Sequence, residues 1–239
     1  MNLNATLYGL GALLLGAVGI CFHDFAMQWQ PVPAGIAGRT MLAYLSGALL
    51  IIGGGAILSG KGERGGALLL ASFYGLWMLV LNLPVALKSF THIGAWNSPA
   101  EIAFLTAGGT ALVANSAGQL RRTLSVVARI VAGISAMVFG FAHFNYIDFT
   151  ASFVPAWIPG KVFWAWATGA GHLAAGIALV SGIKARLAAT LLAGMMGSFV
   201  VLLHIPRVIV SPDQHIEWIM LAVSSALTGA ALLVRKYST

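Results

Sequence analysis

The chain has 239 residues, of which 59% are hydrophobic and only 8% are charged, and its mean hydropathy is +0.90. Soluble domains carry about 25% charged residues, so this composition excludes a soluble fold and indicates an all-α polytopic membrane protein. The net charge of +7 does not indicate nucleic-acid binding, because the basic residues lie in short segments between apolar runs. The single cysteine, Cys21, excludes an internal disulfide.

Apolar runs of about 20 residues recur along the chain, and each is long enough to cross a bilayer core as a helix. No Lys or Arg precedes the first run and no clear small-residue cleavage site follows it. We therefore interpret it as a retained span rather than a removable signal peptide. Glycine, proline and charged residues between the runs predict eight spans, at approximately residues 5–23, 40–58, 66–86, 100–117, 124–144, 161–181, 186–205 and 216–234.

The distribution of basic residues predicts the orientation of these spans. With eight spans both termini lie on one side, and the segments on that side carry Lys61, Arg64, Arg121, Arg122, Lys184, Arg186, Arg235 and Lys236. The opposite side carries only Arg39, Lys88, Lys161 and Arg207. By the positive-inside rule both termini are expected in the cytoplasm of a bacterial inner membrane, with most acids and histidines at the periplasmic face.

The chain contains an internal repeat. Residues 32–84 and 154–206 align without a gap at an offset of 122, and 20 of the 53 aligned positions are identical. Upstream, His23 falls opposite His143 at an offset of 120, and downstream Glu101 falls opposite Glu217 at an offset of 116. We expect two parallel four-helix repeats, residues 1–120 and 121–239, related by an axis along the membrane normal.

The two repeats differ at positions that bear on function. Leu42, Leu50 and Asn82 of the first stand opposite Trp164, His172 and His204 of the second, which indicates a specialised second half on a scaffolding first half.

His172 is expected near the bilayer midplane, where an ionisable group should face the bundle interior or water. Trp164, Thr168 and His172 are spaced four apart and share one helical stripe, with Lys161 near its outer end. With His204, this stripe predicts a ligand-binding wall of a cavity open to the outside. The alternative is a neutral histidine bonded to a neighbouring helix.

Other polar and aromatic residues suggest two further roles. His23 and His143 could pair on a metal or haem, although there is no close spacing such as His-x-x-x-His, and the alternative is interfacial histidines bonded to water. Glu101 and Glu217 are expected to complement helix N-termini. Asp148 lies in an expected loop, either at a site or paired with a basic residue. Trp157, between two prolines, belongs either to an aromatic belt or to a lid over a flat ligand.

These residues resemble the DoxX-like family of small four-helix membrane proteins. The segments "GFAHF", "VPAWIPG" and "TGAGHLAAGIALVSGIKARLAATLLAG" of the second half carry the resemblance, and the first half fits it more loosely. Many members have Gly-x-x-Glu-Leu-x-x-Gly where this chain has "GAGHLAAG", so His172 stands in place of a glutamate. The resemblance implies the four-helix fold, with relatives in thiosulfate:quinone oxidoreductase, methylamine dehydrogenase maturation and receptor assembly.

Three functions follow as hypotheses. The first is a quinone- or lipid-binding subunit of a periplasm-facing redox system, with a periplasmic or membrane redox partner and a pocket formed by His172, Thr168, Trp164 and His204. The second is a non-catalytic assembly protein that stabilises a partner. The third is a small-molecule transporter, which parallel repeats can form. The sequence contains no complete catalytic motif and does not define the cofactor, the substrate or the oligomeric state.

Overall fold

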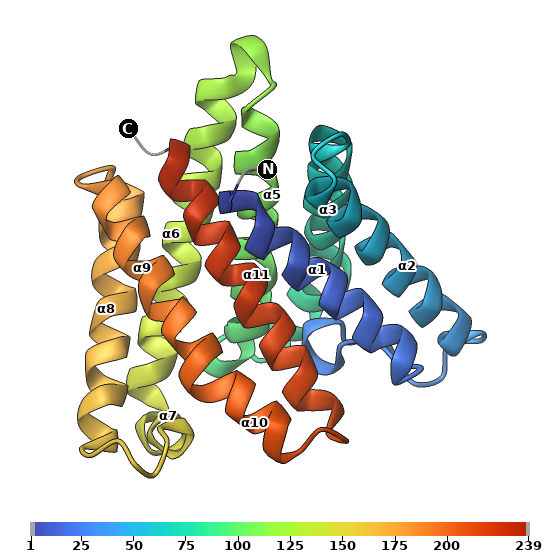
Figure 1. Ribbon diagram of the computed structural model, residues 1–239. Helices are drawn as coiled ribbons and strands as arrows, with labels where there is room; N and C mark the ends of the chain where they lie inside the picture. The colour runs from blue at the N-terminus through green and yellow to red at the C-terminus, as the bar shows by residue number, and fades with distance from the viewer. Residues whose placement is uncertain (1–2, 238–239) are drawn as a thin grey trace.

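The computed structural model describes residues 3–237, and every regular element in that range is helical (Figure 1). A bilayer core offers no water to unpaired backbone groups, so apolar spans satisfy these groups within helices. The long helices are α1 (Leu3–Cys21), α2 (Arg39–Leu58), α3 (Glu63–Leu76), α5 (Asn97–Ala114), α6 (Arg121–Asn145), α8 (Lys161–Ser181), α9 (Ala185–Phe199) and α11 (His215–Tyr237). Short elements connect them: η1 (Met27–Trp29), η2 (Trp77–Asn82), α4 (Leu83–Leu87), η3 (Ile93–Trp96), η4 (Gly118–Leu120), α7 (Ile147–Phe153), η5 (Val200–His204) and α10 (Ile205–Val210).

Seven helical stretches within residues 3–237 are long and apolar enough to cross a membrane, which makes this a multi-pass integral membrane protein. They correspond to seven of the eight expected spans. The other expected span, 100–117, corresponds to α5, which is not among the seven. The helix begins with Asn97, Ser98 and Pro99 and carries Glu101 in its second turn, and these residues lower its hydropathy.

Two of the spans contain a π-helical segment at matching places. The helix over Glu63–Leu87 includes η2, and the helix over Ala185–Val210 includes η5. A proline, Pro84 or Pro206, is the second residue of the short helix that follows each segment. Proline lacks an N–H and leaves a carbonyl one turn earlier without its helical partner, and a widened turn accommodates this. The last residues of the two π segments lie 122 residues apart, and so do the two prolines; this is the offset of the gapless alignment.

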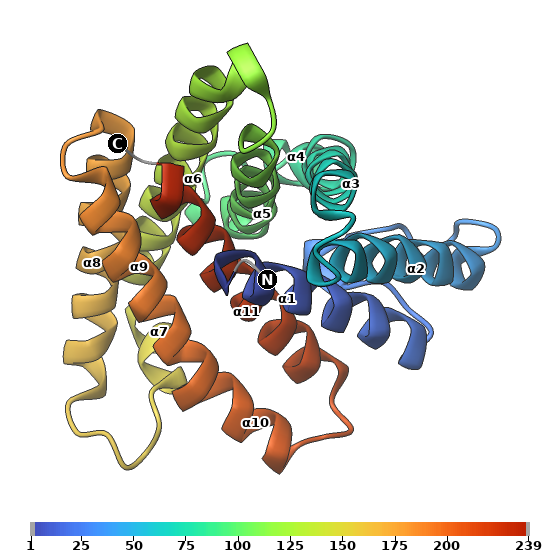
Figure 2. The same ribbon diagram turned by 45° about the horizontal axis from the view of Figure 1, so that its top comes forward.

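The helices pair across the two halves of the chain. Within each half, α1 packs on α2 and α6 packs on α8, but α1 also packs on α11, and α6 packs on α5. Helices α5 and α11 contact each other in the middle (Figures 1 and 2). Thus the first helix of each half lies against the last helix of the other half, and neither half is a closed four-helix bundle.

Close contacts between glycines fix the register of the two first helices. A Cβ on Gly16 would lie 2.4 Å from the Gly47 carbonyl oxygen, and one on Gly140 would lie 2.9 Å from the Gly169 carbonyl oxygen. Gly47 and Gly169 are 122 apart, but Gly16 and Gly140 are 124 apart. The expectation that His23 is equivalent to His143 at an offset of 120 is therefore wrong. In the register set by these contacts, the residue equivalent to His143 is Gly19, because the connection after α1 is longer than the one after α6.

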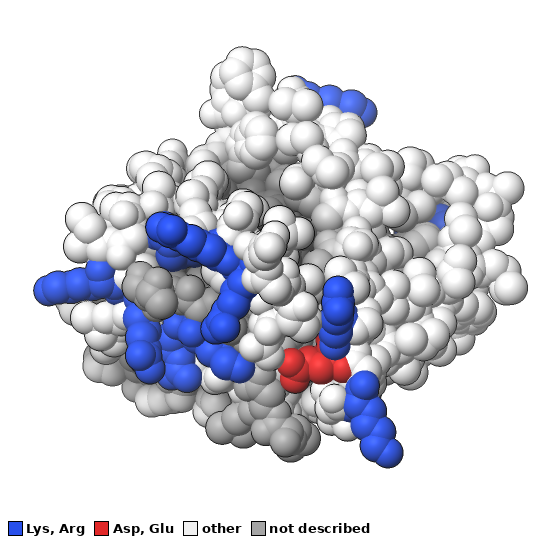
Figure 3. Space-filling view, turned by 90° about the horizontal axis from the view of Figure 1, so that it is seen from above, with Lys and Arg blue, Asp and Glu red and all other residues white. Residues whose placement is uncertain are grey.

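One end of the bundle is strongly basic. The first turn of α1 and the last turn of α11 lie together there, and Arg235 donates to the Asn4 side chain over 3.1 Å (Figure 1). Seen from this end, Lys and Arg side chains dominate the charged surface (Figure 3). The loops 59–62, 115–120 and 182–184 connect helices at the same end. This is the arrangement expected from the charge distribution in the sequence.

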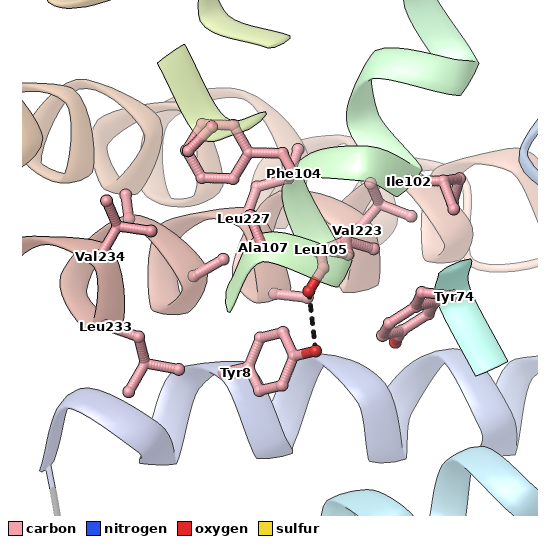
Figure 4. Close-up of a cluster of buried hydrophobic side chains, with 14 of the residues drawn as sticks. Tyr8, Tyr74, Ile102, Phe104, Leu105, Ala107, Val223, Leu227, Leu233 and Val234 are labelled. Carbon is pink, nitrogen blue, oxygen red and sulfur yellow. Dashed lines mark hydrogen bonds between the residues drawn. The ribbon is translucent and has the colours of Figure 1, made fainter. Parts of the chain in front are cut away.

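The core lies where α1, α3, α5 and α11 meet (Figure 4). Tyr8 of α1 is fully buried and donates its hydroxyl to the Leu105 carbonyl oxygen of α5 over 2.8 Å. Its ring packs edge to face with Tyr74 of α3 at a centroid distance of 6.4 Å. This hydrogen bond occupies a backbone acceptor inside the bundle and ties the first and fourth helices of the first half together across the core.

Candidate functional site

His172 lies in the fourth turn of α8 and is only 3% exposed. Its Nδ1 atom has no hydrogen-bond partner. Leaving a polar group buried and unpaired costs about 1–3 kcal/mol, so such a group in a membrane core calls for an explanation. The alternative expected from the sequence, a histidine bonded to a neighbouring helix, does not account for this nitrogen.

Aromatic and imidazole rings surround His172. The His143 ring of α6 lies 5.1 Å from it between centroids, the Phe139 ring 5.5 Å and the Phe199 ring of α9 6.2 Å. His143 is itself anchored, because its Nδ1 lies 2.8 Å from the Phe139 carbonyl oxygen. Three helices of the second half thus place two imidazoles and two phenyl rings around one buried point. This cluster, His143, His172, Phe139 and Phe199, is named the imidazole cluster below.

His204 is the second buried histidine with an unpaired Nδ1. It ends the π segment η5, five residues after Phe199. In its counterpart in the first half, Asn82, the side-chain amide nitrogen donates to the carbonyl oxygens of Trp29 over 2.9 Å and Trp77 over 3.3 Å. At this position, the buried side-chain nitrogen is hydrogen-bonded in the first half, whereas Nδ1 of the histidine has no partner in the second.

The remaining residues of the expected site lie elsewhere. Thr168 bonds the carbonyl oxygens of Trp164 and Ala165 in its own helix, and Trp164 is 45% exposed with its indole N–H on the Pro159 carbonyl oxygen. Trp157 is 72% exposed, which favours the belt over the lid. Asp148 is exposed in the first turn of α7, so the expected loop there is a short helix. The stripe along α8 is thus lipid-exposed at its outer end and buried only at His172.

Arg207 and Glu217 form an ion pair in this half. Two hydrogen bonds of 2.7 and 2.6 Å join the guanidinium to the carboxylate, whose side chain is only 9% exposed. Arg207 also lies 4.8 Å from the centre of the Phe153 ring of α7. The pair links α10 to α11, so Glu217 has a partner besides the helix N-terminus expected for it.

In the first half, a connector that folds back into the bundle carries the polar contacts. Trp29 of η1 is buried and donates its indole N–H to Glu101 of α5. The neighbouring Gln30 donates to the Ser46 hydroxyl of α2 over 2.9 Å. The position of Glu101 in the sequence predicts only a helix-opening acid, and no role is predicted for Trp29. The unusual Gln-Trp-Gln triplet after an apolar span was the available signal.

A small polar cavity lies between α1, α2 and the start of α11, and its α1 and α2 residues occupy positions equivalent to the imidazole cluster. Its volume is about 10 Å³, close to the space of one water molecule. Leu15, Gly19 and Leu50 line it, and these correspond to Phe139, His143 and His172 in the packing register. Its polar lining residues are Asp24, Gln30, Ser46 and His215.

No group of three or more His, Cys, Asp or Glu residues within residues 3–237 is arranged to hold a metal ion. Of the two alternatives for His23 and His143, the pairing on a metal or haem is not formed. His23 lies beyond the end of α1 in a left-handed conformation, and its Nδ1 is 2.8 Å from the Tyr44 hydroxyl. His143 instead lies against His172.

These features define the class of protein: an all-helical, multi-pass integral membrane protein with buried imidazoles in its second half. The model of the DoxX family matches residues 124–205, from α6 through α8, α9 and η5. This part of the chain is DoxX-like, as the resemblance predicted, and it contains His143, His172 and His204. Comparisons with curated proteins and with solved structures gave no match.

Proposed function

We propose that the protein binds a quinone or a similar ring-shaped amphiphile at the imidazole cluster, as part of a periplasm-facing redox system. The observation that carries the proposal is the unpaired Nδ1 of His172, which is 3% exposed. A quinone carbonyl is a neutral hydrogen-bond acceptor on an apolar ring, and it would satisfy an imidazole N–H without bringing charge into the membrane.

The surroundings of His172 support a flat ligand. Phe139 and Phe199 offer ring faces or edges on two sides, and aromatic pairs gain from stacking beyond their buried area. Both phenyl rings pack on His172, so binding requires these side chains to move aside. His143 supplies a second imidazole on the adjoining helix. Leu50 and Gly19 stand at the corresponding places of the first half, which gives one such site per chain.

The overall architecture proposed is two DoxX-like four-helix repeats, residues 1–120 and 121–239, with α5 as the eighth membrane-crossing helix. Three observations support it. The π segments lie 122 residues apart, the glycine contacts recur between α1–α2 and α6–α8, and the cross-pairing of first and last helices is reciprocal.

The ligand proposal is tested on protein purified in mild detergent. Extracted lipids are analysed for quinone by mass spectrometry, and a short-chain quinone is titrated while intrinsic tryptophan fluorescence is recorded. We expect saturable binding that His172→Leu abolishes, since leucine occupies the matching position of the first half. His92→Leu, at an exposed loop histidine, is the matched control and should bind normally. Absence of quinone together with no binding on titration would refute the proposal.

The orientation proposed is that both termini lie in the cytoplasm of a bacterial inner membrane. Cys21 is exposed at the end of α1 remote from the basic face, so a membrane-impermeant maleimide should label it in intact spheroplasts. In a Cys21→Ser background, a cysteine at Ser59, at the α2–α3 connection, should react only after permeabilisation. The opposite labelling pattern would reverse the orientation and place the basic face outside.

A further inference from the structure

A groove of about 310 Å³ runs between α8 and α9 in the second half. These two helices pack side by side at one edge of the molecule (Figures 1 and 2). The groove is open to the surroundings, and Ala174, Leu187 and Leu191 on its walls are exposed. Every lining residue is apolar except one at the end: Gly171, Ala174, Ala175, Ala178, Leu187, Ala188, Leu191, Leu192, Met195 and Lys184.

Two alanines hold the helices apart. In the first half, Gly53 of α2 and Gly66 of α3 meet so closely that a Cβ on Gly66 would lie 2.5 Å from the Gly53 carbonyl oxygen. The positions 122 residues later are Ala175 and Ala188, and both line the groove. Their Cβ atoms prevent the same backbone approach, so α8 and α9 cannot close on each other as α2 and α3 do.

Smaller side chains then leave the space between α8 and α9 empty. Gly171 and Ala174 of α8 replace the bulky Leu49 and Ile52 of α2. These are the side chains that would otherwise cover the wall of the groove. The open groove thus results from specific differences between two related segments, not from a general looseness of the fold.

The shape of the groove favours a single hydrocarbon chain. Its lining extends over two turns of α8 and more than two turns of α9, which corresponds to about 12 Å of length. Dividing the volume by this length gives a mean cross-section of about 25 Å². A helix about 10 Å wide has a cross-section of about 80 Å², so the backbone of a partner helix does not fit.

Lys184 places one positive charge at the end of this apolar groove. It is exposed in the loop between α8 and α9, which lies at the basic end of the molecule (Figure 1). Neither of the ion pairs Asp24–Arg39 and Arg207–Glu217 involves Lys184, which has no acidic partner within residues 3–237. Gly62 stands at the corresponding position of the first half. The second half has therefore both the groove and the cation.

We propose that this groove binds one acyl chain of an anionic phospholipid, whose phosphate group pairs with Lys184. The walls match the apolar chain, the cross-section admits one chain, and the charge complements the headgroup at membrane-surface level. The site is separate from the imidazole cluster, because His172 faces the interior of the second half whereas the groove faces the lipid.

The test is native mass spectrometry of the full-length protein, delipidated in detergent and titrated with phosphatidylglycerol or phosphatidylethanolamine. Ala174→Ile introduces the first-half residue and fills the groove, and Ala170→Ile places the same side chain on an exposed α8 position outside it. Lys184→Gly removes the charge at a residue whose φ of 51° suits glycine, so folding is preserved. Lys184→Arg is the charge-conserving control.

We expect wild-type protein to retain phosphatidylglycerol in preference to phosphatidylethanolamine. Lys184→Gly should reduce that preference about fivefold, the contribution of one basic residue at an anionic surface, while Lys184→Arg keeps it. Ala174→Ile should remove one bound lipid of either kind, and Ala170→Ile should remove none. Unchanged lipid binding by Ala174→Ile would overturn the proposal. So would a second protein chain that occupies the wild-type groove and is displaced by Ala174→Ile.

Discussion

Substitution of Gly229 by alanine tests whether α1 and α11 join the two halves as described. Gly229 lies in α11 against α1, and a Cβ there would be 2.1 Å from the Tyr8 backbone nitrogen and 2.6 Å from its Cα. Both atoms belong to the backbone, so no side-chain rotation relieves the contact. Ordinary contact begins near 3.4 Å, and the two helices must separate by more than 1 Å.

The expected cost follows from two opposing effects. Overpacking of a tight contact costs about 1–3 kcal/mol, and a contact with the backbone belongs at the upper end of that range. Alanine in place of glycine favours a helix by about 1 kcal/mol. The net loss in the free energy of unfolding is therefore about 2 kcal/mol, which lowers the melting temperature by about 4–8 °C in a chain of this size.

The assay is thermal unfolding in detergent, followed by intrinsic fluorescence and by the loss of the monodisperse peak in size-exclusion chromatography. The control is Gly194→Ala in α9, where a Cβ would meet nothing within 4 Å. That variant gains only the helix-propensity term and should melt at the same temperature or slightly higher. If both variants melt alike, or if Gly229→Ala melts higher, the packing of α1 on α11 described above is refuted.

Three further substitutions have defined outcomes in the same assay. Trp29→Phe keeps a ring but removes the N–H that binds Glu101, and it should lower the free energy of unfolding by about 1–3 kcal/mol. An unchanged melting temperature would show that this hydrogen bond does not stabilise the connector between α1 and α2. His172→Leu removes a buried unpaired nitrogen and should stabilise ligand-free protein by about 1–3 kcal/mol, whereas a lower melting temperature would mean that the imidazole is bonded. Arg207→Ala leaves the carboxylate of Glu217 unpaired and should lower the free energy of unfolding by about 1–3 kcal/mol. The loss should be smaller at high salt, because the arginine is partly exposed. A loss that does not change with salt would contradict an ionic origin.

The hydropathy of the sequence was sufficient to predict the spans, because length and apolarity are what a bilayer requires of a helix. Seven of them correspond to helices that are long and apolar enough to cross a membrane, including the helix over Lys161–Ser181 with its expected bounds, and the eighth corresponds to α5. The gapless alignment also placed Asn82 and His204 at matching positions, and both end a π segment. The apolar spans and the gapless alignment are both uninterrupted patterns of residues, and the predictions drawn from such patterns agree with the helices and π segments of the structure.

Helix pairing was not predictable in the same way. All spans are apolar on the lipid side, so hydropathy does not distinguish the neighbour of α1, and small-residue contacts such as Gly11 on Ala226 decide it. Because the connectors after α1 and α6 differ in length, His23 is not equivalent to His143 in the structure. The contact between His143 and His172 was therefore not predicted from the sequence. The burial of Trp29 depends on a distant partner, Glu101, which no local pattern reveals.

The reciprocal pairing of α1 with α11 and of α6 with α5 has a consequence for biogenesis. Helix α1 emerges from the ribosome long before α11 does, so its Gly11 face stays uncovered in the bilayer until α11 has been synthesised. The same pairing would arise between two separate four-helix chains exchanging their outer helices. In the proposed two-repeat architecture, one polypeptide fixes a one-to-one stoichiometry and allows the second repeat alone to carry the buried His172 and His204.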